Sequence, residues 1–130
     1  VCIVLSGPGD RAFVTQVGAT GLLSTKHLTK VSDALSEEGL KRLCVHVSGF
    51  FCLPAIKKDL AAFLRDLRAS AEERGVELCV SFDTNCDASD QWDSGVRGVL
   101  EQVDVFIPNE TEACGISKQS DVQAAAQALA

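Results

Sequence analysis

VDVFIPNETE, residues 103–112, decides the fold of this chain. Its first half, VDVFI, is rich in β-branched and aromatic residues and predicts a buried strand. Asn109 follows the strand, and Glu112 stands three residues further on, which is the pattern of a helix start in which the two side chains cap the first turn. We therefore expect a strand that runs directly into a helix over about Asn109 to Gly115.

Two more strands and two helices precede this stretch. LCVHVS at 43–48 and VELCVSF at 76–82 are short apolar runs that predict strands. Helical patterns cover 55–74, with Gly75 as a stop, and about 92–102. Strands that alternate with helices pair in parallel through right-handed crossovers. The chain is therefore predicted to be α/β, with a Rossmann-like parallel sheet flanked by helices.

The N-terminal part has a different pattern. Residues 1–20 hold two β-rich runs around the turn SGPGD, which predicts a β-hairpin. One or two short helices are expected over about 25–43, and another over 120–130. We divide the chain into this hairpin and an α/β portion at 21–130. Because the chain starts at Val1, lacks Met and ends without a helix stop signal, we expect a domain truncated at both ends.

Composition excludes several classes of protein. A hydrophobic content of 46% with 23% charged residues is typical of a soluble globular domain. No apolar run approaches the roughly 18 residues of a membrane span, and no secretory leader is recognisable, so no membrane contact and a cytoplasmic location are expected. The formal charge of −6 is scattered, without a Lys/Arg cluster, so nucleic acid is not an expected partner.

Cysteine and histidine usage argues against disulfides and zinc. Six cysteines are widely spread without a C-x-x-C pair, and we interpret them as reduced, mostly buried thiols. His27 and His46 stand in no ligand spacing, which disfavours zinc. His46 lies within an apolar run and is interpreted as a core histidine.

Polar side chains follow the predicted strands at their carboxyl ends, where parallel sheets bind ligands. Gly49 follows the first strand, Asp83 and Asn85 follow the second, and Asn109 and Glu112 follow the third. Carboxylate and amide oxygens suit Mg²⁺, and a helix N-terminus attracts phosphate. The same spacings fit a plain capping box and a plain Asx turn, so both interpretations stay open.

Other binding motifs fail on inspection. DTNCDASDQWD at 83–93 begins like a calcium-binding EF-hand loop, but Ala88 occupies the position of the required Gly and Ser94 that of the bidentate Glu. The P-loop, the dinucleotide-binding fingerprint and the G-x-S-x-G nucleophile motif are all absent from the sequence.

In their order, the segments resemble the ribokinase-like carbohydrate kinase family, also called the PfkB family. GDRAFVTQVGAT at 9–20 is similar to its lid hairpin, LCVHVSGFF at 43–51 to its strand ending in H-x-S-G, and VSFDTNCDASDQW at 80–92 to its D-x-N…W segment. VDVFIPNETEA at 103–113 is similar to D-x-x-x-P-N-x-x-E-A, the most specific of the four. The resemblance spans nearly the whole chain and implies a partial ribokinase-like fold.

The resemblance implies ATP-dependent phosphotransfer to a hydroxyl of a sugar, nucleoside or related small molecule, with Mg²⁺ bridging the phosphates. On the family pattern, Asn109 and Glu112 match the residues that organise magnesium, through water, and phosphate. Asp83 and Asn85 match the segment that lines the cleft for ATP phosphates and substrate.

The resemblance also implies a lid, and this chain departs from the family pattern at two positions. Asp10 and Arg11 match the lid that closes over substrate, Gly49 matches a substrate-side turn, and the hairpin could carry a homodimer contact. Asp87 stands where the family often has Arg, and Thr84 replaces a common Pro. The G-A-G-D element with the catalytic Asp base is expected beyond residue 130, so no catalytic residue is assigned and the chain alone is expected to be inactive.

Two alternatives to an active kinase stay open. One is a ligand-binding or regulatory relative that kept the fold and lost the chemistry. The other is an unrelated doubly wound domain in which Asn109 and Glu112 form only a helix cap.

Overall fold

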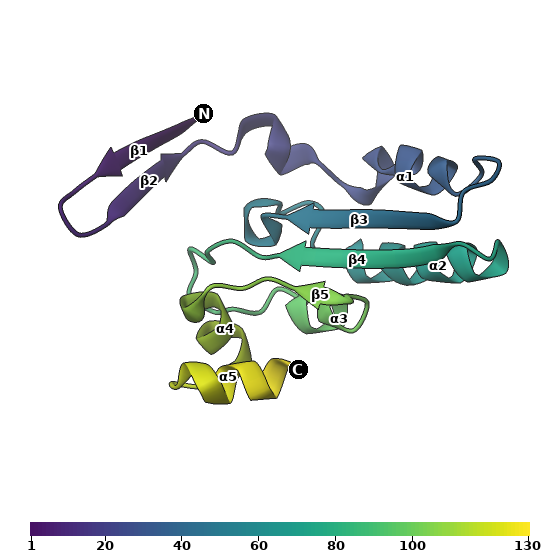
Figure 1. Ribbon diagram of the computed structural model, residues 1–130. Coiled ribbons are helices and arrows are strands. Elements are labelled where there is room, and N and C mark those ends of the chain that lie inside the picture. Colours follow the sequence, from purple (N-terminus) through teal and green to yellow (C-terminus); the bar gives the residue numbers. More distant parts are fainter.

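The structure is a computed structural model that describes all residues, Val1–Ala130, and it contains two separate sheets (Figure 1). An antiparallel hairpin is followed by a parallel sheet in the order β3-β4-β5. The strands are β1 Cys2–Ser6, β2 Arg11–Thr15, β3 Arg42–Ser48, β4 Glu77–Asp83 and β5 Val105–Phe106. This arrangement confirms the predicted α/β class with its N-terminal hairpin.

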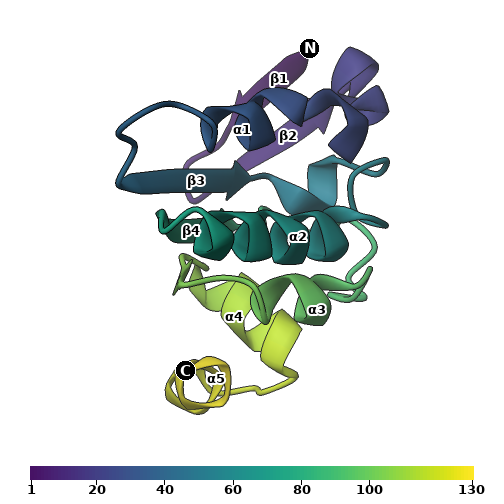
Figure 2. The same ribbon diagram turned by 90° about the vertical axis from the view of Figure 1, so that its right-hand side faces the viewer.

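The helices of the parallel-sheet region lie mainly on one side of it. They are α1 Thr29–Ala34, α2 Leu60–Glu73, α3 Val96–Leu100, α4 Glu110–Ser117 and α5 Val122–Leu129, with short 3₁₀ turns η1 Gly18–Leu22, η2 Thr25–His27 and η3 Phe50–Cys52. Figures 1 and 2 show α1, α2 and α3 along the same face of the sheet, while α4 and α5 pack together beyond β5.

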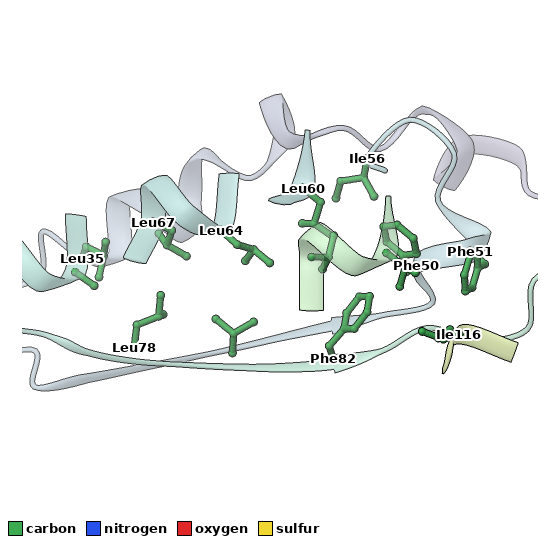
Figure 3. Close-up of a cluster of buried hydrophobic side chains, with 14 of the residues drawn as sticks. Leu35, Phe50, Phe51, Ile56, Leu60, Leu64, Leu67, Leu78, Phe82 and Ile116 are labelled. Carbon is green, nitrogen blue, oxygen red and sulfur yellow. The ribbon is translucent and has the colours of Figure 1, made fainter. Parts of the chain in front are cut away.

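The core lies between α2 and the sheet (Figure 3). Leu60, Leu64 and Leu67 recur at helical spacing on α2 and are buried, while Leu78 and Phe82 are buried at alternate positions of β4. Burying each such side chain contributes roughly 1.5–3 kcal/mol relative to an exposed position. This packing fixes β4, and hence the polar residues that follow it.

The opposite face of the sheet is uncovered, which corrects the prediction that residues 103–107 form a buried strand. Only Val105 and Phe106 pair with β4, and Val105 and Ile107 are 47% and 54% exposed. The physical reason is that helices cover one face of this sheet, so every second residue of its strands meets solvent.

Two predicted helices are shorter than expected. Over 55–74, turns occupy the first residues and α2 begins at Leu60; its end at Gly75, which has φ of 66°, is as predicted. Over 92–102, only α3 is helical, because Trp92 and Ser94 have φ of 51° and 62°, outside the helical region.

The burial predicted for the thiols and for His46 is also wrong. All six cysteines are free, as expected, but four are exposed and two are partly buried. Cys44, Cys79 and His46 alternate with apolar neighbours and point to the uncovered face of the sheet. An apolar run does not show which face of a strand is covered, and these side chains lie on the open one.

Candidate functional site

The carboxyl end of β4 forms a fixed polar turn. The backbone N–H of Asn85 donates to Asp83 Oδ1 at 3.0 Å, and Ser48 Oγ, at the end of β3, donates to Asp83 Oδ2 at 3.2 Å. Asn85 has φ of 59°, a conformation that Asn tolerates better than most residues. The Asx turn, one of the two interpretations that the sequence left open, is therefore present, and it orients the Asp83 carboxylate.

The start of α4 is a complete capping box. Asn109 Oδ1 accepts from the Glu112 N–H at 3.0 Å, and Glu112 Oε2 accepts from the Asn109 N–H at 3.1 Å. In addition, Asn109 Nδ2 donates to Glu112 Oε1 at 2.7 Å, and Glu112 is only 5% exposed. The cap interpretation is confirmed. Each carboxylate oxygen has more than one acceptor position, so capping does not exhaust its capacity for water.

These two polar ends share one open hollow. It has a volume of about 440 Å³ and is lined by His46, Asp83, Asn85, Ile107, Asn109 and Glu112. Four of the residues selected from the sequence are thus brought together at the carboxyl edge of the sheet. A second hollow, of about 530 Å³, lies between β5 and α5; it is lined mainly by apolar residues and also by Asn109.

The sequence interpretation missed two lining residues, Ile107 and His46, of which His46 is the polar one. Its Nδ1 lies 2.8 Å from Ser81 Oγ on the neighbouring strand. The signal was available: His46 and Ser48 are two residues apart on one strand and therefore share a face.

The lid residues lie away from the hollow. Asp10 and Arg11 are at the hairpin turn, which projects from the body of the molecule (Figure 1), and both are exposed. The Arg11 N–H donates to Asp10 Oδ1 at 2.7 Å, and the Arg11 guanidinium lies 5.6 Å from the Phe13 ring centre. Gly49 has φ of 74° and donates its N–H to the Asp83 carbonyl at 2.9 Å, so it braces β3 against the β4 turn.

Asp87 faces into its own loop. It is 7% exposed and accepts from the N–H and Oγ of Ser89 at 3.0 and 2.8 Å and from the Trp92 N–H at 2.8 Å. Burial raises the pKa of this carboxyl, but the hydrogen bonds from Ser89 and Trp92 outweigh burial and hold the pKa below its ordinary value. The Asp87 carboxylate thus organises the loop and does not line the hollow.

The donor set fits a hydrated magnesium ion better than a directly bound metal. No group of three or more His, Cys, Asp or Glu side chains is close enough to hold a metal ion directly. The hollow offers carboxylates from Asp83 and Glu112 and amides from Asn85 and Asn109, which are oxygen ligands suited to Mg²⁺ that retains several waters.

The fold and the hollow define an α/β protein with a polar ligand site at the carboxyl edge of a parallel sheet. Residues 1–130 match the model of the pfkB family carbohydrate kinases, so the chain belongs to this family. Kinases of the family generally use ATP and Mg²⁺ and act on sugar-type substrates.

Two further comparisons add no relative. No curated protein and no solved structure matches the chain. None of its helices combines the length and apolarity required to cross a membrane.

Proposed function

We propose that the protein transfers the γ-phosphoryl group of ATP to a hydroxyl of a sugar, nucleoside or related small molecule, in the cytoplasm. The observation that carries this proposal is the hollow in which the α4 N-terminus, Asn109 and Glu112 face the Asp83–Asn85 turn. Phosphoryl transfer depends mostly on positioning and charge neutralisation, and this hollow combines fixed donors with fixed carboxylates.

The chain's own groups would divide the work in the hollow. Backbone N–H groups at the start of α4 and the positive end of the helix dipole attract phosphate oxygens. Glu112 and Asn109, fixed on one another by three hydrogen bonds, would hold magnesium through its waters. Bound Mg²⁺ would neutralise the charge of the phosphates. Asp83, held by Ser48 and Asn85, would orient donors on the substrate or on metal-bound water.

The hairpin would act as the lid, with Asp10 and Arg11 reaching the substrate after closure, and Gly49 would shape the substrate-side turn. Closure excludes water and protects ATP from hydrolysis. The hairpin exposes apolar side chains on both faces, including Phe13 at 55% and Val14 at 58%. Such a surface would also serve a homodimer contact through the hairpin. The catalytic base is expected in the family's G-A-G-D element, which residues 1–130 do not contain.

The test is ADP formation with Mg·ATP across a panel of sugars and nucleosides, using the protein with its G-A-G-D element present. We expect one acceptor class to give ADP together with a phosphorylated product of matching mass. ATP binding without ADP formation for any acceptor would instead support the ligand-binding relative. A well-folded protein that neither binds Mg·ATP nor turns over would contradict both functions.

A further inference from the structure

The uncovered face of the sheet carries a ladder of paired side chains. β3 and β4 are parallel, and their residues are in direct register. Alternate residues of both strands point away from α2 toward solvent. The four rungs on this face are Arg42–Glu77, Cys44–Cys79, His46–Ser81 and Ser48–Asp83.

Three rungs are joined by polar contacts, and the fourth is not. The side chains meet at 2.8 Å in the Arg42–Glu77 rung, 2.8 Å in the His46–Ser81 rung and 3.2 Å in the Ser48–Asp83 rung. The remaining rung consists of two free thiols, Cys44 and Cys79.

The spacing of this rung suits a covalent link. Neighbouring strands lie about 4.8 Å apart, and disulfide-bonded residues have Cα atoms about 4.4–6.8 Å apart. Cys44 and Cys79 are Cα partners in the register, and their side chains project from the same face. Cys44 is exposed and Cys79 is partly buried, so a reagent in solution reaches Cys44 first.

We propose that Cys44 and Cys79 form a redox-active dithiol that a small disulfide, such as oxidised glutathione, converts reversibly into a cross-strand disulfide. The Cys44 thiolate attacks one sulfur of the small disulfide, its S–S bond breaks, and one thiolate leaves. The Cys79 thiolate then attacks Cys44 Sγ, closes the protein disulfide and expels the second small thiol. Overall, two protein thiols are oxidised and one small disulfide is reduced to two thiols.

The register sets these two cysteines apart from the others. Arg42 occupies the next rung, where its guanidinium is paired with Glu77 Oε2 at 2.8 Å. None of the other cysteines is the register partner of a second cysteine.

The Cys44–Cys79 disulfide would join β3 and β4 covalently, and the carboxyl ends of these two strands reach the candidate site. Ser48 ends β3 and Asp83 ends β4, two rungs beyond the thiol pair. Oxidation would therefore fix β3 to β4 beneath the Ser48–Asp83 contact without adding a group to the hollow. This inference does not depend on the proposed kinase activity.

The experiment treats the folded chain with buffers of oxidised and reduced glutathione, blocks residual thiols by alkylation and maps peptides by mass spectrometry without reduction. Trypsin cuts after Arg42 and Arg74, and chymotrypsin cuts after Phe50 and Phe82. Residues 43–50 and 75–82 then each contain one cysteine, which separates this pair from the other thiols.

The expected result is a predominant link between these two peptides that lacks two hydrogens, disappears with dithiothreitol and is absent from Cys79→Ser. In that variant, Cys44 should instead retain glutathione as a mixed disulfide. Circular dichroism of the wild-type chain before and after oxidation confirms that the linked species is folded. Glutathione on each cysteine without the link, or links to Cys2 and Cys114 in equal amounts, would overturn the proposal.

Discussion

Replacing Gly115 with Ala should push α4 away from the loop that follows β4. A Cβ atom at Gly115 would lie 2.4 Å from Trp92 Cδ2 and 2.5 Å from both Cε2 and Cγ of the same ring. Trp92 is only 6% exposed, and its Nε1 donates to Asp90 Oδ1 at 2.6 Å, so the indole has little freedom to withdraw. The helix backbone must move instead.

The sign of the stability change follows from two opposing terms. Gly to Ala inside a helix normally stabilises a protein by roughly 0.5–1 kcal/mol. Here the new contact must open by about 1 Å to reach the ordinary carbon separation of roughly 3.5 Å, and overpacking of this kind costs about 1–3 kcal/mol. We expect a net loss of about 1–2 kcal/mol in the free energy of unfolding.

Urea unfolding followed by Trp92 fluorescence measures this directly, because Trp92 is the single tryptophan. Gly98→Ala is the matched control: its Cβ would lie 3.7 Å from Ala61 Cβ, an ordinary contact, so this variant should equal or exceed the wild type in stability. If Gly115→Ala unfolds at the same urea concentration as the wild type, with unchanged Trp92 emission, the result would contradict the close packing of α4 against the indole ring.

Three further predictions concern buried or hydrogen-bonded polar side chains. Thr84 Oγ1 is fully buried without a hydrogen-bond partner, so Thr84→Val should leave stability unchanged or raise it by about 1 kcal/mol in urea unfolding; a clear loss would reveal a hidden partner. Asp87→Asn should lower the free energy of unfolding by about 1–3 kcal/mol and broaden the amide NMR signals of the loop, because Asn offers one acceptor oxygen where Asp87 uses two. A variant as stable as the wild type would contradict the loop's dependence on the carboxylate. Burial raises the pKa of the Asp87 and Asp104 carboxyls, but hydrogen bonds outweigh burial and hold both pKa values below the ordinary value. The hydrogen bonds to Asp104 come from Val80 and Arg68. The contribution of these two carboxylates to folding stability is therefore fully present above the ordinary carboxyl pKa of 3.8 and is lost as the pH falls below it, through their lower pKa values in the folded state. Urea midpoints that stay constant with pH through this range would contradict the prediction.

Local sequence signals predicted the elements that depend on local chemistry. The Asn109–Glu112 spacing gave the helix cap because both partners lie within one turn, and Gly75 gave the end of α2 because a positive φ favours glycine. The two long strands, β3 and β4, were placed within one residue at each end, since their apolar runs are bounded by polar or glycine residues.

Local sequence patterns could not predict the features that depend on tertiary contacts. Trp92 and Ser94 read as helical, but Asp87 draws the Trp92 N–H to itself and the loop takes positive φ values instead. His46 and Cys44 sit among apolar residues, yet the absence of helices on that face leaves both exposed. Side-chain periodicity identifies the two faces of a strand without showing which is covered.

The candidate site was recoverable in part. Asp83, Asn85, Asn109 and Glu112 converge because parallel strands end at the same edge, a rule that needs only the strand order. The lid residues Asp10 and Arg11 were not tied to that edge by any local rule, and the structure leaves them at the tip of a projecting hairpin.

The most direct test of the proposed site is the effect of Mg²⁺ on ATP affinity in the wild type, Glu112→Gln and Glu110→Gln, measured by calorimetry with Mg²⁺ or with EDTA. Gln can replace Glu in a capping box, so Glu112→Gln removes the charge and keeps the cap. Glu110 is exposed on the same first turn and does not line the hollow. We predict that Mg²⁺ tightens ATP binding by about tenfold or more, about 1.4 kcal/mol, in the wild type and Glu110→Gln, and that Glu112→Gln loses this gain. Equal Mg²⁺ dependence in all three proteins would contradict the site and leave Glu112 as a helix cap only.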